Sequence, residues 1–318
     1  MAQDEKVLVT GGAGFIGSHL VEALANARER VVVFDNFTTG SRDNLAASMR
    51  VDIIEGDVRD LDSLRRATEG VGVVFHLAAV SAVAPSVKDP LTSNAVNVTG
   101  TLDVLIAARD AGVRRVVFAS SAAVYGSNPW VPKTETHLPE PLSPYAATKL
   151  AGEVYCRVFS RIYGLETVTL RLFNVYGPRQ NPASEDSGVV TRFLARLATG
   201  QPPIIDGDGE QSRDLVYVGD VVGAFLRSRE APAANGEVLN IGSGRSTTIN
   251  ELAETLAGIA APDRILHPIH RPERAGDVHH SCADITKARQ VLEYAPAVEL
   301  ADGLARTHAW WRESGNSR

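Results

Sequence analysis

Tyr145 and Lys149 are a pair of residues whose types and spacing could transfer a proton. They lie four positions apart in the segment SPYAATK, in which Ser143 suits a helix cap and Pro144 suits the first helical turn. The spacing places the phenol and the ammonium group on one helical face. An ordinary phenol has a pKa of about 10, and a neighbouring cation lowers that pKa by favouring phenolate. The pair therefore predicts a tyrosine general base.

Two serines strengthen this interpretation, which alone is weak because tyrosine and lysine often occur four apart on solvated helix faces. Ser120 and Ser121 directly follow a predicted strand at 115–119. Parallel sheets with helices on both faces bind their ligands at the carboxyl ends of the strands. The serines therefore fall where a catalytic phenol would need a hydrogen-bonding partner.

A glycine-rich turn, TGGAGFIG at 10–17, lies between a predicted strand and a predicted helix. Gly11, Gly14 and Gly17 let the backbone turn sharply, approach a pyrophosphate and pack the helix on the sheet. Phe15 and Ile16 open the helix, whose unpaired N–H groups and positive dipole end favour the same anion. Because glycine-rich turns are common, the flanking strand and helix carry the prediction of a dinucleotide site.

Asp35 ends the next predicted strand, eighteen positions after Gly17, which suits a carboxylate that binds ribose hydroxyls. Its charge would repel a 2′-phosphate, and no arginine follows immediately, so NAD is favoured over NADP. Asp35 with Asn36 could also form an ordinary turn. Asp57 and Val58 follow the third predicted strand and could meet the adenine edge, although an aspartate there could equally cap the helix that begins near residue 60.

The elements that position these residues alternate along the first half of the chain. Nearly continuous apolar runs predict strands at 7–10, 31–35, 52–55, 73–77 and 115–119, and helical spacing predicts helices at 16–28, 61–69 and 91–111. This alternation predicts an α/β fold, a doubly wound parallel sheet of the Rossmann type. From about residue 181 the chain becomes rich in turns, with helices expected near 189–198, 218–229, 250–259 and 302–312. We expect an NAD-binding domain at 1–175, with chain crossings from about 210–245, and a smaller α/β substrate lobe mainly at 176–318.

Composition excludes several classes of protein. The 318 residues are 44% hydrophobic and 22% charged, with a net charge of −6, which is typical of a globular chain and unsuited to bulk binding of nucleic acid. Cys156 and Cys282 have no disulfide or zinc spacing, and the loop histidines lack accompanying ligands, so no metal is expected. With no secretory signal or membrane span in view, we expect a soluble cytoplasmic protein.

Five segments together resemble the extended short-chain dehydrogenase/reductase family, and within it the UDP-glucose and UDP-N-acetylglucosamine 4-epimerase group: TGGAGFIG, HLAA at 76–79, SSAAVYG at 120–126, YAATK at 145–149 and RLFNVYGPRQ at 171–180. The resemblance implies a tightly held NAD. It implies that Tyr145 is the base, that Lys149 binds ribose and stabilises the phenolate, and that Ser121 bridges the sugar O4 and Tyr145. It also implies cofactor contacts from the residues Leu77, Ala78, Ala79 and Asn97.

The resemblance extends to the substrate lobe. It implies that Asn174 binds the diphosphate and that Val189 lines the substrate site. It further implies that Arg213, Arg274 and Asp277 grip the diphosphate and the uridine ribose. Planar guanidinium groups suit phosphate oxygens, and a carboxylate suits ribose hydroxyls, although these residues could instead form surface ion pairs.

The residues beside Ser121 reduce the number of reactions that the site could catalyse. Related dehydratases carry an Asp-Glu pair just after the hydroxyl residue and decarboxylases carry a Glu nearby, whereas this chain has Ala122 and Ala123, which cannot exchange protons. We therefore expect Tyr145 to remove the O4 proton while hydride passes from C4 to NAD. The 4-keto sugar then rotates, and hydride returns to its opposite face.

Ser281 bears on the choice of sugar. In the family that this chain resembles, enzymes restricted to UDP-glucose and UDP-galactose have a tyrosine at this place. A small residue instead leaves room for an acetamido group. The GPRQNP segment at 177–182 also resembles the N-acetylhexosamine branch, whereas Ala122 and Ala123 depart from the hydroxyl-rich segment of some of its members. We expect interconversion of UDP-GlcNAc and UDP-GalNAc with some activity on UDP-Glc and UDP-Gal, unless Ser281 merely packs beside a strand.

The sequence leaves two alternative functions open and favours one oligomeric state. A UDP-glucuronate 4-epimerase would need a cation beside the C6 carboxylate, which Arg192 or Arg179 could supply. A non-catalytic NAD-binding protein is the second rival, against which the intact serine, tyrosine and lysine speak. Relatives pair through two helices into a four-helix bundle, so the apolar faces of 91–111 and 145–163 favour a homodimer.

Overall fold

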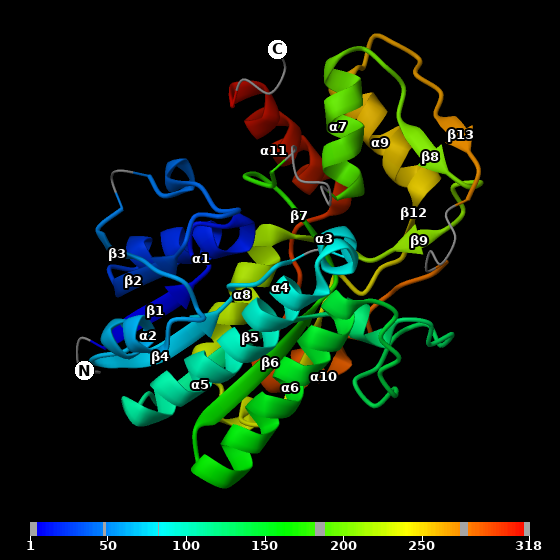
Figure 1. The fold of residues 1–318 in the computed structure, drawn as a ribbon. Helices are drawn as coiled ribbons and strands as arrows, with labels where there is room; N and C mark the ends of the chain where they lie inside the picture. The colour runs from blue at the N-terminus through cyan, green and yellow to red at the C-terminus, as the bar shows by residue number, and fades with distance from the viewer. Residues whose placement is uncertain (1–4, 47–48, 82, 182–187, 274–278, 315–318) are drawn as a thin grey trace.

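A seven-stranded parallel sheet forms the larger lobe of the computed structural model, which describes residues 5–46, 49–81, 83–181, 188–273 and 279–314 (Figure 1). The strand order is β11-β6-β5-β4-β1-β2-β3. The strands are β1 (Lys6–Thr10), β2 (Arg30–Asp35), β3 (Val51–Glu55), β4 (Val71–His76), β5 (Arg115–Ser121), β6 (Glu166–Leu172) and β11 (Val238–Ile241). The doubly wound parallel sheet predicted from the apolar runs is confirmed.

Both faces of the sheet are covered, which explains why the strands are apolar throughout rather than alternating. In β1, Val7 and Val9 pack into one core and Leu8 into the other. The first core is closed by α1 (Phe15–Asn26), α8 (Val218–Glu230) and α10 (Thr286–Leu292). The second is closed by α2 (Leu61–Ala67), α5 (Gly100–Asp110) and α6 (Pro144–Tyr163).

The helix predicted at 91–111 is interrupted. The chain first forms α3 (Val83–Lys88), which sequence periodicity missed, and then α4 (Pro90–Asn94). A π-helical turn, η2 (Ala95–Thr99), separates α4 from α5. Such a turn is often found at functional sites. Here it contains the buried Asn97, whose contacts are described below.

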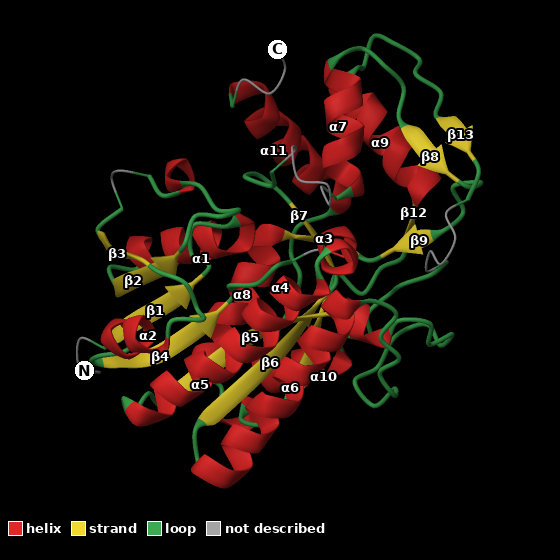
Figure 2. Cartoon of the chain, in the orientation of Figure 1, coloured by secondary structure: helices red, strands yellow, loops and turns green. Residues whose placement is uncertain are grey.

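A smaller lobe stands over the carboxyl edge of the sheet (Figure 2). Its helices α7 (Val189–Ala198), α9 (Ile249–Ala260) and α11 (Leu300–Glu313) share a core that includes Leu252, Leu304 and Trp311. Short strand pairs complete the lobe: β7 (Asn174–Tyr176) with β10 (Leu215–Tyr217), β8 (Ile204–Asp206) with β13 (Ile269–Arg271), and β9 (Ser212–Arg213) with β12 (Thr247–Thr248). None of the helices in the described residues is long and apolar enough to cross a membrane.

The chain passes between the lobes more than once. After β10 it returns as α8 against α1, and β11 then pairs with β6 as an edge strand of the large sheet. It returns again as α10, which packs against β11. Within the residues that the structure describes, three 3₁₀ turns connect elements: η1 (Arg42–Asn44), η3 (Ala122–Tyr125) and η4 (Pro232–Ala234).

Candidate active site

The glycine-rich turn between β1 and α1 has the geometry that a dinucleotide pyrophosphate requires. Gly11 has φ +69°, and a Cβ there would lie 2.7 Å from the backbone nitrogen of Ala78. A Cβ on Gly17 would lie 2.1 Å from the carbonyl oxygen of Gly11. Gly14 is the N-cap of α1, and in the described chain no side chain caps that first turn and no acidic residue lies in it. The turn therefore leaves an open, positively polarised helix end that fits NAD.

Gly17→Ala should disrupt this turn, because the new methyl group meets rigid backbone rather than a flexible side chain. We expect the free energy of unfolding to fall by about 1–3 kcal/mol and NAD affinity to fall with it. Thermal unfolding and NAD titration would measure both. Gly223→Ala in α8, where a Cβ meets nothing within 4 Å, is the matched control and should not lower stability. Equal losses in the two variants would contradict the packing argument.

Asp35 joins the end of β2 to the glycine-rich turn. Its two carboxylate oxygens accept hydrogen bonds from the backbone N–H groups of Ala13 (2.9 Å) and Phe37 (2.8 Å). Asp35 is 8% exposed, so its carboxylate is largely shielded from solvent. Asn36 donates to Asp57 Oδ2 at 3.0 Å and thereby links the ends of β2 and β3.

Asp57 does not cap the following helix, because Asp60 does so by accepting from the N–H of Ser63 at 3.1 Å. Asp57 instead receives two hydrogen bonds from the Arg59 guanidinium, at 2.8 and 2.7 Å, and these hold its pKa well below the ordinary value. The neighbouring Val58 side chain is buried and faces Gly100 of α5. The Asp57–Val58 segment thus forms a fixed border of the region predicted to receive adenine.

The segment after β4 lies against the glycine-rich turn. The N–H of Leu77 donates to the Thr10 carbonyl (3.1 Å), and that of Ala78 donates to Thr10 Oγ1 (3.3 Å). His76 Nδ1 also lies 2.7 Å from Thr10 Oγ1, and burial lowers the pKa of His76 to about 3. A neutral His76 therefore helps to place Leu77, Ala78 and Ala79 beside Gly11.

Asn97 acts on the same segment from the π-helical turn. Its Oδ1 accepts from the N–H of Val80 (2.8 Å), and its Nδ2 donates to the Val80 carbonyl (3.1 Å) and to Thr148 Oγ1 (3.0 Å). These contacts join the strand end after β4 to helix α6. The structure thus places Asn97 between the expected cofactor turn and the helix that carries Tyr145.

Tyr145 and Lys149 of α6 lie beside the carboxyl end of β5, the strand that Ser121 ends. Ser143 caps α6 by accepting from the N–H of Ala146 (3.2 Å), so Tyr145 lies in the first turn, and its own N–H donates to Ser86 Oγ of α3 (3.0 Å). Lys149 Nζ lies 5.9 Å from the centroid of the Tyr145 ring. Ser121 is half-buried and ends β5, where its Oγ accepts from the Ala123 N–H at 3.1 Å.

The Lys149 ammonium is buried at 4% exposure and donates to the Ala119 carbonyl at 2.8 Å. Burial lowers its pKa to about 8, although the carboxylate of Glu153 acts in the opposite direction. The side chain therefore remains mainly protonated at neutral pH and places its charge beside the Tyr145 ring. A cation in this position favours phenolate, which a general base requires.

The predicted substrate ligands lie on strand ends of the smaller lobe. Asn174 is exposed at the start of β7, and its N–H donates to the Asp214 carbonyl at 3.1 Å. Arg213 Nη1 donates to the carbonyls of Ser212 (2.9 Å) and His279 (3.3 Å). The N–H of Ser281 donates to the same Ser212 carbonyl at 3.1 Å. Arg213 and Ser281 therefore share one backbone acceptor, the carbonyl oxygen of Ser212.

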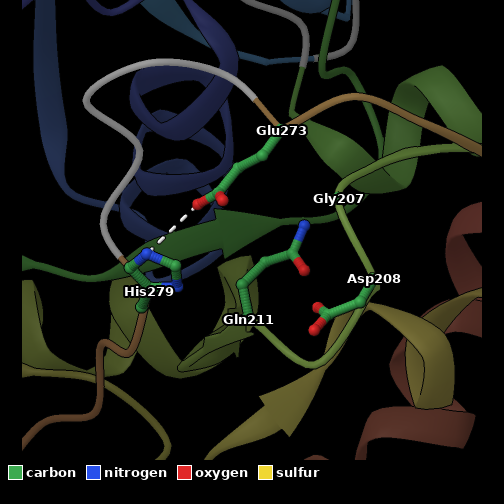
Figure 3. A pocket seen from close by; sticks show the side chains of 5 residues that line it. All are labelled: Gly207, Asp208, Gln211, Glu273 and His279. Atoms are coloured by element: carbon green, nitrogen blue, oxygen red, sulfur yellow. Dashed lines mark ion pairs between the residues drawn. The ribbon is translucent and has the colours of Figure 1, made fainter.

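A pocket of about 240 Å³ lies in the smaller lobe (Figure 3). It is lined by Gly207, Asp208, Gln211, Glu273 and His279, and an ion-pair contact of 3.1 Å joins His279 Nε2 to Glu273 Oε1. Val189 is the first residue of α7 and packs on the core of this lobe. Arg274 and Asp277 lie outside the described residues.

Three buried charged residues at the site were missed from the sequence. Glu153 of α6 and Arg171 of β6 form an ion pair at 2.8 Å. The carboxylate of Asp214 accepts four hydrogen bonds from the segments at 243–244 and 283. Glu153 is four positions after Lys149, on the face that carries the catalytic pair, and this spacing was a signal available in the sequence. Arg171 and Asp214 had no such local signal, because their partners are far away in the chain.

Comparison with known proteins agrees with this geometry. Residues 7–242 match the model of the NAD dependent epimerase/dehydratase family. The chain is 43% identical over 313 residues to a UDP-glucose 4-epimerase of Mycolicibacterium smegmatis, covering 96% of this chain and 98% of that one.

Two solved structures share the whole fold. A UDP-N-acetylglucosamine 4-epimerase from Methanobrevibacter ruminantium, in complex with UDP-N-acetylmuramic acid, has a TM-score of 0.93 and 38% identity and covers 98% of this chain and 99% of its own. A Thermus thermophilus UDP-glucose 4-epimerase in complex with NAD has a TM-score of 0.87 and 38% identity, with 96% and 99% covered. The chain therefore belongs to the NAD-dependent epimerase/dehydratase family, among the extended short-chain dehydrogenases/reductases, and has UDP-sugar 4-epimerases among its homologues.

Proposed function

We propose that this protein is an isomerase that interconverts UDP-GlcNAc and UDP-GalNAc by NAD-dependent epimerisation at C4, with slower activity on UDP-Glc and UDP-Gal. The feature that supports the proposal most is the position of Tyr145 and Lys149 beside the end of the strand that carries Ser121, together with a turn shaped for a dinucleotide. Ala122 and Ala123 occupy the turn directly after Ser121 and offer no further proton donor. This set suits a reaction that needs one base.

The protein residues supply proton transfer and position. NAD, when bound, takes up the hydride from C4 and returns it to the opposite face of the sugar. The Tyr145 phenolate, which the Lys149 cation stabilises, removes the proton from O4 and becomes a phenol. Ser121 bridges O4 and the phenol by hydrogen bonds. The same Tyr145 oxygen returns the proton to O4 of the product, so the phenolate is restored at the end of each turnover.

Both faces of the sugar must be presented while the nucleotide stays bound. We assign the diphosphate and uridine to Asn174, Arg213, Arg274 and Asp277, as the family resemblance implies. An anchor at the nucleotide end leaves the hexose free to turn above the strand ends.

Incubation of the purified protein with each UDP-sugar, followed by separation of the epimers, tests the proposal. We expect faster conversion of UDP-GlcNAc than of UDP-Glc and an absorbance spectrum that reports bound NAD(H). Bound NAD(H) without conversion of any sugar would instead support a non-catalytic binding protein. Rapid conversion of UDP-glucuronate would support the second rival. That rival is not favoured through Arg179, whose guanidinium already pairs with Glu22 at 2.6 Å.

Ser281→Tyr should change the preferred sugar. The tyrosine ring would fill the space that we assign to the acetamido group, so kcat/KM for UDP-GlcNAc should fall by about tenfold or more. The value for UDP-Glc should stay within about threefold, because its C2 hydroxyl needs less room. Ser281→Ala, which keeps the site small, is the control and should retain both activities. An unchanged ratio of the two substrates in Ser281→Tyr would remove Ser281 from the specificity assignment.

We also propose a homodimer formed through α3, α4 and α6. Val87 and Leu91 are 62% and 82% exposed, and both helices pack on α6. On α6, Val154, Val158 and Ile162 repeat every four residues and are exposed as well. An apolar stripe of this kind is costly in water unless another surface covers it.

The double variant Val158→Glu/Ile162→Glu should be monomeric, because it places two charges in the middle of the apolar stripe. Light scattering coupled to size exclusion measures the mass directly. Ile265→Glu is the control, since Ile265 is also an exposed aliphatic side chain but lies in the other lobe. A monomeric wild-type protein would contradict the dimer.

A further inference from the structure

Glu153 connects the three elements that build the catalytic site. Its side chain is fully buried in α6, where Oε1 accepts from Ser120 Oγ of β5 (2.5 Å) and from Arg171 Nε of β6 (2.9 Å). Its Oε2 accepts from Arg171 Nη2 at 2.8 Å. Ser120 and Arg171 are direct neighbours in the sheet register. One carboxylate thus ties α6 to both strands at their carboxyl ends.

These contacts support Ser121 from both sides. Ser120 precedes it and is held by Glu153, while the preceding Ala119 carbonyl accepts from Lys149 one helical turn earlier in α6. On the other side, the Arg171 guanidinium lies 4.7 Å from the ring centroid of Tyr125, which ends the turn that follows Ser121. The position of the Ser121 hydroxyl relative to α6 therefore depends on the Glu153–Arg171 pair.

Glu153 also determines the charge around Lys149. In the described part of the chain, the ionisable groups that face Lys149 are His76 from β4 and Tyr145, Glu153 and Cys156 from α6, and β5 contributes the apolar ring of Phe118. Burial lowers the pKa of His76 to about 3 and raises that of Cys156 to about 12, so both are neutral at pH 7. Glu153 supplies the negative charge that favours the Lys149 cation.

Stability alone does not account for such a pair. Moving two charges out of water is costly, and apolar residues of similar volume often replace a buried ion pair without loss of stability. We propose that Glu153 is a positioning residue of the epimerisation site, which places Ser121 through Ser120 and Arg171 and keeps Lys149 protonated. This inference rests on the proposed roles of Ser121, Tyr145 and Lys149.

Two variants separate the positioning effect from the charge effect. Glu153→Gln removes the charge and weakens both contacts. We expect kcat for the UDP-hexose to fall about tenfold or more with KM nearly unchanged, because a small misplacement of reacting groups is costly. The alkaline limb of its kcat–pH profile should move toward lower pH, because the negative charge that raises the pKa of Lys149 is gone. Ser120→Ala removes only the hydroxyl contact and should lower kcat without moving that limb.

Glu166→Gln is the matched control. Glu166 pairs with the buried Arg115 at 2.8 Å across the same two strands, but at their opposite end. Its kcat and pH profile should match those of the wild type. NAD content and circular dichroism of each variant report whether the fold is retained.

Each result of these assays supports or overturns the positioning role of Glu153. Wild-type kcat and an unmoved alkaline limb in Glu153→Gln would overturn the inference, as would equal losses in Glu166→Gln. If Glu153→Gln does not fold, Ser120→Ala decides, since normal turnover in that variant would refute the positioning role. Tyr145→Phe is assayed alongside, because an active Tyr145→Phe overturns the proposed function, whereas an inactive one with a fully active Glu153→Gln overturns only the role of Glu153.

Discussion

Tyr145→Phe should lower kcat for UDP-hexose epimerisation about a thousandfold, because removal of the phenolic oxygen leaves no base at O4. General acid–base groups contribute about 10²–10⁴-fold in rate. The ring itself remains, so NAD and UDP-sugar should bind with nearly unchanged affinity. Initial rates of epimer formation, with isothermal titration of UDP and NAD, would measure both quantities.

Tyr155→Phe is the matched control for this prediction. Tyr155 lies on the same helix but packs beside the core rather than at the strand ends. It should lose less than about twofold in kcat, since surface and core-edge hydroxyls contribute little. Turnover at the wild-type rate in Tyr145→Phe would refute the assignment of the base.

Lys149→Met should have two opposite effects, a loss of turnover of about a hundredfold or more and a gain in stability of the protein without NAD. The loss follows from removal of the cation beside the phenol. The gain follows because burial lowers the pKa of Lys149 from its ordinary value of 10.5 to about 8, so the fold disfavours the charged form. After subtraction of the hydrogen bond to Ala119, we expect about 2 kcal/mol at pH 7.

The pH dependence of that gain has a definite sign. Below pH 8 the lysine is charged in both folded and unfolded chains, and the cost of burying it is present in full. Between pH 8 and 10.5 the folded protein releases its proton first, so the wild type regains stability and the advantage of Lys149→Met fades. Chemical denaturation from pH 7 to 10 would measure this change.

Lys133→Met provides the comparison for catalysis, because Lys133 is also buried but is not part of the proposed site. Its kcat should stay near the wild-type value. A constant stability difference between Lys149→Met and the wild type from pH 7 to 10 would contradict the buried-cation argument.

The cofactor half of the molecule could be predicted well from the sequence because its signals are local. Gly11 and Gly17 need their exact residue type for backbone reasons that the spacing of the turn already indicates, and Tyr145 and Lys149 share a face through helical periodicity alone. Continuous apolar strands indicated a sheet covered on both faces. These features depend on neighbours within a few residues, and the structure confirms the fold that they predict.

The rest depends on partners that lie far apart in the chain. The Glu153–Arg171 pair joins residues from a helix and a later strand, and Asp214 accepts from the N–H of Ala283, which is 69 positions away. The strands of the smaller lobe are two or three residues long, too short to show alternation. The break at η2 was missed because a π-helical turn is defined by i→i+5 backbone hydrogen bonds, which require no particular residue type that a sequence would reveal.

The return of the chain as β11 has a consequence for attempts to divide this protein. β6 is bordered on its outer side by a strand that begins only at residue 238, after α7 and the strands β7 to β10 of the smaller lobe. A fragment cut at the boundary near 175 would leave β6 with a row of unpaired backbone groups, which invites aggregation. New specificities are therefore easier to obtain by changing side chains around a shared scaffold than by exchanging one half of the gene for another.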